Sequence, residues 1–144
     1  MRIGSISTTI CLRDAAVVLD ATALLAILFD EPERPRMEEA IDADPLRLVS
    51  ALSKLSAALA LTQRHGPDAP ARLDRLLSEI KATIAPFDEP QADLASAAFA
   101  RFGQGRHAAA LDWSACAAYA LAIAEAESLL FVGRGLGETD VEAA

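Results

Sequence analysis

The chain has 144 residues, 53% of them hydrophobic and only 5% aromatic, so it is long enough for one domain with an aliphatic core. Its formal net charge of −8 argues against broad electrostatic capture of nucleic acid, which needs a basic surface. A nuclease with an acidic metal centre can still be acidic, so charge alone does not decide the function. No stretch reaches the roughly 18 uninterrupted apolar residues of a membrane span, and we expect no membrane association.

The amino-terminal residues and the cysteines indicate where the domain begins and in which compartment the protein is expected. Residues 1–15 combine charged and polar side chains without the apolar run of a secretion signal, and we expect a poorly ordered leader there. Cys11 and Cys116 are the only cysteines, too few for a disulfide framework or a zinc site. These features predict a cytoplasmic protein with a single domain over residues 16–142.

Apolar strands and helical stretches alternate along the chain. In its first half the pattern predicts a strand over 16–20, helices over 22–29 and 33–43, a strand over 46–50 and a helix over 51–64. In its second half it predicts a helix over 68–82, a strand over 83–87, a helix over 90–102, a glycine loop over 103–107, a helix over 113–127 and a strand over 129–132. The alternation predicts a three-layer α/β/α domain with a short parallel sheet.

Asp20 stands out because it ends the first predicted strand, whose apolar residues 17–19 are typical of a buried parallel strand. Ligands of open α/β sheets bind at the carboxyl ends of such strands, which makes Asp20 a candidate site residue. The same aspartate is also a suitable N-cap for the helix that follows. From its position alone, the two interpretations are about equally favoured.

An ordered set of segments resembles the PIN-domain family, in particular the VapC-type toxins of bacterial toxin–antitoxin pairs. The matching segments are 17–24 (VVLDATAL), 30–33 (DEPE), 48–51 (LVSA), 85–88 (APFD), 105–107 (GRH), 116–122 (CAAYALA), 129–133 (LLFVG) and 139–141 (TDV). Each segment is weak by itself, whereas their common order and spacing over about residues 16–142 is specific. The resemblance implies the PIN-like fold and favours the site interpretation of Asp20.

The resemblance further implies a Mg²⁺- or Mn²⁺-dependent endoribonuclease with a cognate antitoxin, an RNA substrate if it is active, and a homodimeric assembly. Mg²⁺ is held by a few carboxylates together with substrate phosphate, and it activates water at the reacting bond. In the family one metal-binding acid ends the first strand, which places Asp20 as catalytic residue and metal ligand. Thr22 matches the hydroxyl residue that supports it.

Three of the four acids that the resemblance calls for are replaced in this chain. The expected glutamate falls at Ser56, the next aspartate at Ala115, and the acid after the last strand at Arg134-Gly135. Asp112, just before the helix predicted over 113–127, is the one candidate replacement as catalytic residue and metal ligand. An N-cap is the favoured interpretation of Asp112 by about two to one.

These replacements predict a stable fold with little metal affinity, because they remove both the mutual repulsion of the carboxylates and the ligands themselves. An ion pair between Asp20 and Arg134 is expected in place of a metal site. The function predicted is therefore that of a VapC-like toxin with reduced or lost ribonuclease activity. The alternative is a catalytically dead PIN domain that acts by binding an antitoxin or another protein in an apolar groove.

Two further alternatives remain open at this point: a non-toxin α/β module in which Asp20 is structural, and a haloacid-dehalogenase-like phosphatase. The phosphatase is disfavoured because Thr22 stands where its second acid belongs. Among other polar and aromatic residues, we expect Arg106 and His107 to lie in a solvated loop, Trp113 and Tyr119 to be core residues, and Asp140 to be a surface charge.

Overall fold

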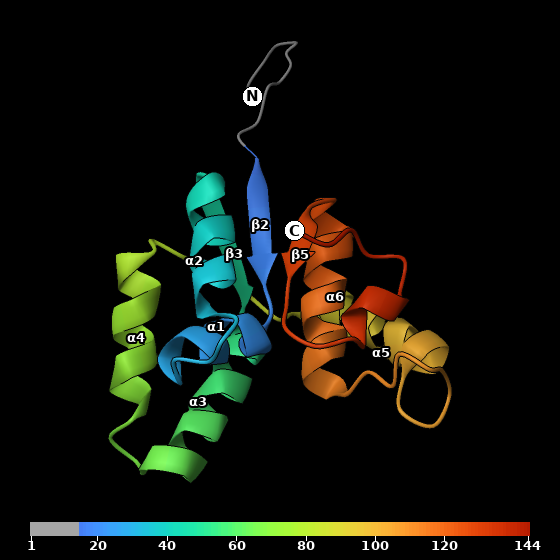
Figure 1. Ribbon diagram of the computed structural model, residues 1–144. Helices are drawn as coiled ribbons and strands as arrows, with labels where there is room; N and C mark the ends of the chain where they lie inside the picture. Colours follow the sequence, from blue (N-terminus) through green and yellow to red (C-terminus); the bar gives the residue numbers. More distant parts are fainter. Residues whose placement is uncertain (1–14) are drawn as a thin grey trace.

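The computed structural model describes residues 15–144, which are built around a four-stranded sheet (Figure 1). Its strands are β2 (Ala16–Leu19), β3 (Leu46–Ser50), β4 (Thr83–Ala85) and β5 (Ser128–Leu130), in the spatial order β4-β3-β2-β5. Each pairing is parallel, with Val18 opposite Leu48 on one side and Leu129 on the other. β2 is therefore a central strand, and its carboxyl end lies in the middle of one edge of the sheet.

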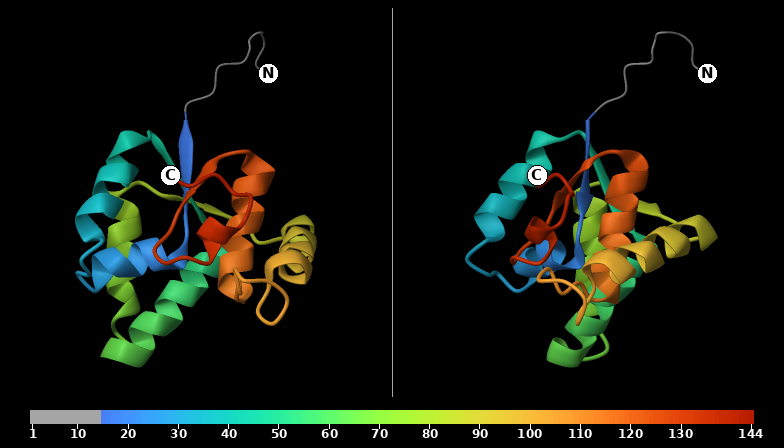
Figure 2. Two further views of the ribbon diagram at one scale, coloured as in Figure 1. Left: turned by 45° about the vertical axis from the view of Figure 1, so that its right-hand side comes forward. Right: turned by 90° about the vertical axis from the view of Figure 1, so that its right-hand side faces the viewer.

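Helices cover both faces of the sheet, as the views in Figure 2 show. One layer contains α1 (Ala21–Leu28), α2 (Arg34–Ala43), α3 (Ala51–His65) and α4 (Pro70–Glu79). The other contains α5 (Glu89–Phe102), α6 (Trp113–Glu125) and the short 3₁₀-helix η1 (Leu136–Glu138). The predicted three-layer α/β/α class with a short parallel sheet is confirmed.

Alternation along β2 divides the core between the two layers. Val17 and Leu19 pack in the core beneath the first layer, whereas Val18 packs under α5 and α6. All three are fully buried, as expected for a parallel strand with helices on both faces. Their position fixes the next residue, Asp20, at the point where the central strand leaves the sheet.

Polar side chains cap the amino-terminal ends of four helices. Asp20 and Ser50 cap α1 and α3 by accepting backbone N–H bonds two residues ahead, and Asp88 and Asp112 cap α5 and α6 three residues ahead. A short side-chain acceptor at the end of a strand satisfies amides that have no partner within the helix. The same caps bring Asp20 and Asp112 to the carboxyl edge of the sheet.

The predicted elements are all present, with differences at their ends. The helix predicted over 68–82 is shorter, because Pro70 occupies its first turn and Lys81 adopts a left-handed backbone conformation with φ of 54°. β4 ends at Ala85 because the next residue is a proline, and α6 ends before Ala126, whose φ is 55°. The predicted leader is almost wholly outside the described residues.

The carboxyl-terminal segment returns to the edge of the sheet after η1, a helical turn that the sequence pattern does not predict. The Leu129 amide donates to the Glu142 carbonyl, and the Ala144 amide donates to the Leu129 carbonyl. These bonds cover the otherwise open edge of β5. Among residues 15–144, no helix is both long and apolar enough to cross a membrane.

Candidate functional site

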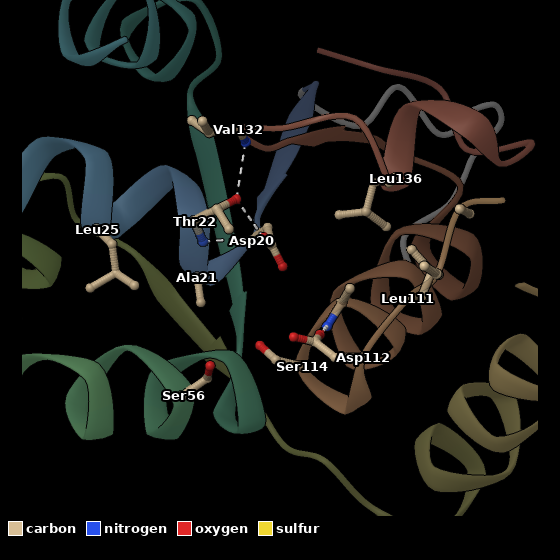
Figure 3. A pocket seen from close by; sticks show the side chains of 14 residues that line it. Asp20, Ala21, Thr22, Leu25, Ser56, Leu111, Asp112, Ser114, Val132 and Leu136 are labelled. Atoms are coloured by element: carbon tan, nitrogen blue, oxygen red, sulfur yellow. Dashed lines mark hydrogen bonds between the residues drawn. The ribbon is translucent and has the colours of Figure 1, made fainter. Parts of the chain in front are cut away.

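A cleft of about 320 Å³ opens at the carboxyl end of β2 (Figure 3). Its walls come from segments far apart in the sequence: the start of α1, one face of α3, the residues around the start of α6, and the segment after β5. The polar side chains that line it are Asp20, Thr22, Ser56, Asp112 and Ser114. This is the place where open α/β sheets bind ligands, and Asp20, the candidate site residue, lines the cleft there.

Asp20 both caps α1 and faces the cleft. Its Oδ2 accepts hydrogen bonds from the Thr22 amide at 3.1 Å and from the Thr22 hydroxyl at 2.5 Å. Thr22 Oγ1 in turn accepts from the Val132 amide at 3.0 Å, which ties the strand-end aspartate to the segment after β5. Asp20 Oδ1 is buried and has no hydrogen-bond partner among the described residues. The cap and site interpretations of Asp20 are thus compatible.

Burial is the main influence on the charge of this carboxyl group. Asp20 is only 3% exposed, and loss of hydration raises its pKa above the usual range. The two hydrogen bonds from Thr22 oppose that shift, and the negative charge of Asp112 adds to it. A buried carboxyl group with a free oxygen and a raised pKa is a proton-accepting position or a position for a cation.

Asp112 likewise caps a helix and lines the cleft. Its Oδ1 accepts a hydrogen bond from the Ala115 amide at 2.9 Å and so caps α6, as predicted. The residue is solvent-exposed and lines the cleft on the side opposite Thr22 (Figure 3). Ser114, which is only 7% exposed, contributes a hydroxyl group beside it. Sequence reasoning did not select Ser114, because a serine in the first turn of a helix has no distinctive spacing.

The positions expected to carry the other acids do meet in the cleft, but they bring no charge. Ser56 and Ala115 line it, as the resemblance predicted. After β5 it is Gly135 that lines the cleft, whereas Arg134 is exposed and not part of the lining. A Cβ atom on Gly135 would lie 2.7 Å from the Ala109 carbonyl oxygen, so a side chain at this position requires the backbone to shift.

The prediction of an ion pair between Asp20 and Arg134 is wrong. Asp20 Oδ1 has no partner, and no ion pair within residues 15–144 joins these two side chains. Physically, the strand-end carboxyl is buried inside the cleft while the arginine is directed to solvent, where its charge stays hydrated. Side-chain direction depends on the surrounding fold, so the residue types at the two positions do not determine it.

The donor set fits a single, weakly held cation at best. Two carboxylates and three hydroxyl groups line the cleft, and one carboxylate oxygen of Asp112 is already used by the helix cap. Within residues 15–144, no three His, Cys, Asp or Glu side chains come together as a metal-binding group. Since Mg²⁺ retains waters and accepts one or two carboxylates together with phosphate, the cleft has the minimum of such ligands and no more.

Residues 104–107 of the glycine loop are solvent-exposed, as expected, and the two basic residues of the loop bond to neighbouring backbone groups. Arg106 Nε donates to the Ala100 carbonyl at 3.0 Å. His107 Nδ1 accepts from the Ala109 amide at 3.0 Å, and its ring meets the Phe102 ring edge-on at a centroid distance of 5.1 Å. Both side chains therefore stabilise the turn before α6.

The structure corrects two assignments among the aromatic and acidic residues. Tyr119 is a core residue as predicted, but Trp113 is 50% exposed, because the first residue of α6 lies beyond the sheet. Asp140 is more than a surface charge: it accepts from the Tyr119 hydroxyl at 2.6 Å and pairs with Arg101 at 3.3 Å. Cys116 is a buried free thiol whose pKa is raised to about 11 by burial, and Cys11 lies outside the described residues.

Comparisons with known proteins agree on the family. The model of the PIN domain matches residues 17–142. A "Ribonuclease VapC" of Mycolicibacterium smegmatis is 39% identical over 127 residues, which is 88% of this chain and 98% of that protein. "Ribonuclease VapC30" of Mycobacterium tuberculosis is 38% identical over 125 residues, covering 87% of this chain and 95% of the relative.

Solved structures show the same fold at low sequence identity. Mycobacterium tuberculosis VapC20, described as a sarcin-ricin loop cleaving toxin, superposes with a TM-score of 0.74 at 8% identity and covers 89% of this chain and 98% of its own. VapBC2 of Rickettsia felis, solved with a fragment of promoter DNA, gives a TM-score of 0.67 at 13% identity, with coverages of 89% and 96%. At these identities the likeness supports the fold alone.

Proposed function

The chain belongs to the PIN-domain family as a VapC-type member, and we propose that it is the toxin-fold partner of a toxin–antitoxin pair whose metal-dependent ribonuclease activity is strongly reduced. Membership in this family removes the phosphatase alternative. It also removes the alternative of an unrelated α/β module, because the match spans the whole sheet and both helical layers.

The observation that carries the proposal is the composition of the cleft. Asp20 and Asp112 are its carboxylates, while Ser56, Ala115 and Gly135 occupy the other positions where the family resemblance calls for acids. A hydroxyl, a methyl group and a hydrogen atom supply neither a negative charge for a cation nor a base for a water molecule. The scaffold of the site is therefore present, and most of its ligands are absent.

Mg²⁺ or Mn²⁺ would be held by Asp20 Oδ1 and by the free oxygen of Asp112, and when bound it would stabilise charge on a scissile phosphate. The raised pKa of Asp20 opposes this, since burial disfavours the charged form of the carboxyl group that a cation requires. Thr22 orients Asp20 in either protonation state through the bonds to Oδ2. We expect cation binding in the millimolar range or weaker and correspondingly slow RNA cleavage.

An antitoxin is the proposed macromolecular partner. The support is family membership together with solved neighbours that are toxin–antitoxin complexes, such as the one from Klebsiella pneumoniae (TM-score 0.63, 16% identity). Loss of the acids does not alter the rest of the surface, so binding of a partner does not depend on catalysis. A catalytically dead protein that acts only by binding an antitoxin or another protein remains the second candidate function, and the same observation on the cleft favours it.

We also propose self-association as a homodimer through α3. Leu55 and Leu59 on this helix are 47% and 51% exposed, and adjacent turns of exposed leucine are typical of an interface. The apolar residues of α1, by contrast, pack mostly into the core. Size-exclusion chromatography with light scattering tests the proposal. We expect the mass of a dimer for the unmodified chain and the mass of a monomer for Leu59→Lys. A monomer mass for the unmodified chain, or a dimer mass for the variant, would refute it.

A restored cleft tests the proposed loss of activity. The double variant Ser56→Glu with Ala115→Asp adds two carboxylates at positions that line the cleft, and Gly135 is left unchanged because a side chain there meets the Ala109 carbonyl. We expect Mn²⁺-dependent cleavage of total RNA to rise at least about 100-fold over the unmodified chain, equivalent to about 2.7 kcal/mol in the barrier. Ser78→Glu, on the exposed face of α4, is the matched control.

Two results would contradict the proposal in different ways. Vigorous cleavage by the unmodified chain that Asp20→Ala abolishes would show that two carboxylates suffice. No cleavage by the restored double variant, with metal binding confirmed by isothermal titration calorimetry, would show that activity requires something beyond the missing acids.

A further inference from the structure

The two carboxyl groups of the cleft at the end of β2 have no basic side chain beside them. Asp20 and Asp112 line the cleft, and none of the described residues that line it is Lys, Arg or His. The Asp20 side chain is buried, and its Oδ1 accepts no hydrogen bond from any described residue. Figure 3 shows the carboxyl group of Asp20 directed into the cleft, toward Ser114 and Asp112. Because a buried acceptor without a partner is destabilising, this oxygen favours a ligand that brings a donor and a positive charge.

The walls of the cleft are mainly aliphatic. The side chains of Leu25, Leu111, Val132 and Leu136 line it together with several alanines. Its volume of about 320 Å³ is within the range of pockets for small organic molecules. A hydrated metal ion has no favourable contact with such walls, whereas the methylene groups of an organic ligand bury apolar area against them. The walls therefore favour an organic cation over a metal ion.

The hydroxyl groups of the cleft suit an ammonium group. Ser56 and Ser114 line the cleft, and neither hydroxyl group is bonded to another described residue. A primary ammonium group donates three hydrogen bonds, and its acceptors need only lie at about 2.7–3.0 Å. Mg²⁺ instead demands near-ideal octahedral oxygen ligands at about 2.0–2.1 Å. The carboxylate and hydroxyl oxygens of this cleft can hold an ammonium group without such precise geometry.

We propose that the cleft binds a short alkyl diamine in its doubly protonated form. One ammonium group bonds to Asp20 Oδ1, the other bonds to the Asp112 carboxylate, and the methylene chain packs against the aliphatic walls. Two positive charges balance the two carboxylates, whereas a monoamine leaves one of them unbalanced. Asp20 should contribute more to the affinity, because it is buried, while Asp112 is exposed and its charge is screened by water and salt.

This diamine site goes beyond the proposed toxin function. It uses the same cleft, but it requires neither an antitoxin nor RNA cleavage. Burial raises the pKa of Asp20, and an ammonium group beside the carboxyl group offsets that shift by favouring the charged form. A cleft with too few acids for firm metal binding therefore still has the charge and the shape for an organic dication.

Calorimetric titration of the full chain tests the class of ligand. The titrations are made at neutral pH in metal-free buffer with a chelator, and the probes are diaminobutane, n-butylamine and butanediol, which differ in charge. We expect saturable binding of diaminobutane with a dissociation constant below about 1 mM. The affinity for n-butylamine should be at least about 10-fold weaker, because it lacks one charge-assisted pair, and butanediol should not bind measurably.

Substitutions at the two carboxylates locate the ligand. Asp20→Asn should weaken diaminobutane binding at least about 10-fold and Asp112→Asn at least about threefold, because each removes a charge and keeps the size of the side chain. Asp88→Asn is the matched control, since Asp88 caps α5 as Asp112 caps α6 but is exposed and outside the cleft lining. The affinity of this control should stay within about twofold of that of the unmodified chain.

A second measurement guards against misfolding and reports the place of binding. Thermal melts should show that all three variants fold, and diaminobutane should raise the melting temperature of the unmodified chain but not that of Asp20→Asn. In amide NMR spectra, diaminobutane should shift the signals of Thr22 and Ala115, whose amides bond to Asp20 and Asp112. The signal of Gln91, whose amide bonds to Asp88, should stay in place.

Three results would overturn the inference: no saturable binding of diaminobutane, equal affinity for diaminobutane and n-butylamine, or equal affinity of Asp20→Asn and the unmodified chain. Cleavage of RNA with Mn²⁺ and no diamine, measured on the same preparation, tests the proposed function separately. Vigorous cleavage overturns the proposed loss of activity whatever the diamine does. Slow cleavage without diamine binding overturns the diamine site alone.

Discussion

Asp20 and Asp140 carry the same carboxyl group in two regions of the molecule, and the two regions act on it in opposite directions. Asp20 is 3% exposed, keeps one oxygen without a partner, and has its pKa raised by burial. The Asp140 side chain is 50% exposed, has both oxygens bound, and has its pKa lowered, chiefly by the hydrogen bond from the Tyr119 hydroxyl. Asp20 is therefore in an unsatisfied position that a ligand can use, whereas Asp140 is in a satisfied position that fixes the chain.

The same difference distinguishes the cleft, which can take a ligand, from the carboxyl-terminal segment, which is held in place by its own bonds. At the cleft, burial disfavours the charged form of the Asp20 carboxyl group, and its Oδ1 has no partner among the described residues. At the carboxyl-terminal segment, the bonds of Asp140 to Tyr119 and Arg101 hold the last residues against α5 and α6. Four substitutions test the contrast, in order of decreasing expected effect.

Thr22→Val should have the largest effect, because Thr22 is the only described side chain that bonds to Asp20. The substitution keeps the volume but removes the donor to Asp20 Oδ2 and the acceptor of the Val132 amide. We expect a loss of about 2 kcal/mol in unfolding free energy, measured by urea denaturation at pH 7. Thr62→Val is the control. The Thr62 hydroxyl donates to the Ala58 carbonyl on the solvent-exposed side of α3, and loss of this bond should lower the unfolding free energy by less than about 0.5 kcal/mol. Equal losses would show that the Thr22 bonds do not support the cleft.

Asp20→Asn should stabilise the protein at neutral pH, by about 1–2 kcal/mol, because it removes a buried charge while the amide oxygen keeps both bonds from Thr22. The folded-state pKa of Asp20 is raised above its unfolded value near 3.8, so the stability of the wild-type carboxyl is full below that pH and is lost as the pH rises through the folded pKa. The gain from Asn should therefore be small at pH 3.5 and large at pH 7 in thermal melts.

The control for this variant is Asp112→Asn, the same change at an exposed cap where asparagine is an equally good acceptor. Its melting temperature should change little at either pH. A loss of stability on Asp20→Asn at pH 7 would show that the carboxylate is charged and well compensated in the folded protein, contrary to the description of the cleft given above.

Asp140→Asn should have the opposite sign, with a loss of about 0.5–1 kcal/mol at pH 7, reduced by solvent screening. Because the folded pKa of Asp140 is lowered, its contribution is present above the unfolded value of 3.8 and is lost as the pH falls through the folded pKa. Wild type and variant should therefore converge in acid. Tyr119, whose pKa is raised to about 12 by burial and by Asp140, should titrate at lower pH in the variant when followed by ultraviolet absorbance.

Glu138→Gln is the control for Asp140→Asn, since Glu138 is exposed in the same segment and its side chain bonds to no described residue. It should leave both the unfolding free energy and the Tyr119 titration unchanged. An unchanged Tyr119 titration in Asp140→Asn would mean that the hydroxyl bond to Asp140 is not formed in solution.

The sequence predicts the fold almost completely and the candidate site only in part. Alternating apolar strands and amphipathic helices are local properties, so elements such as β2 and α3 were predicted close to their observed bounds. The places of Asp20, Ser56 and Ala115 followed from the family resemblance. The exposure of Trp113 and the pairing of Asp140 with Tyr119 depend on contacts between distant segments, which no local pattern records. For the same reason the direction of Arg134 was missed.

Arg134→Ala should have the smallest effect and decides between the predicted ion pair and the observed geometry. Arg134 is exposed and outside the cleft lining, and Asp20 Oδ1 has no partner, so removing the guanidinium should change the unfolding free energy by less than about 0.3 kcal/mol. Arg101→Ala, which breaks a visible pair with Asp140, should cost more. If Arg134 did pair with Asp20, its removal would leave a buried carboxylate uncompensated, and the loss would grow as the pH rises from 4 to 7. A pH-independent difference near zero places the arginine in solvent and leaves the inner oxygen of Asp20 free for a proton or a cation.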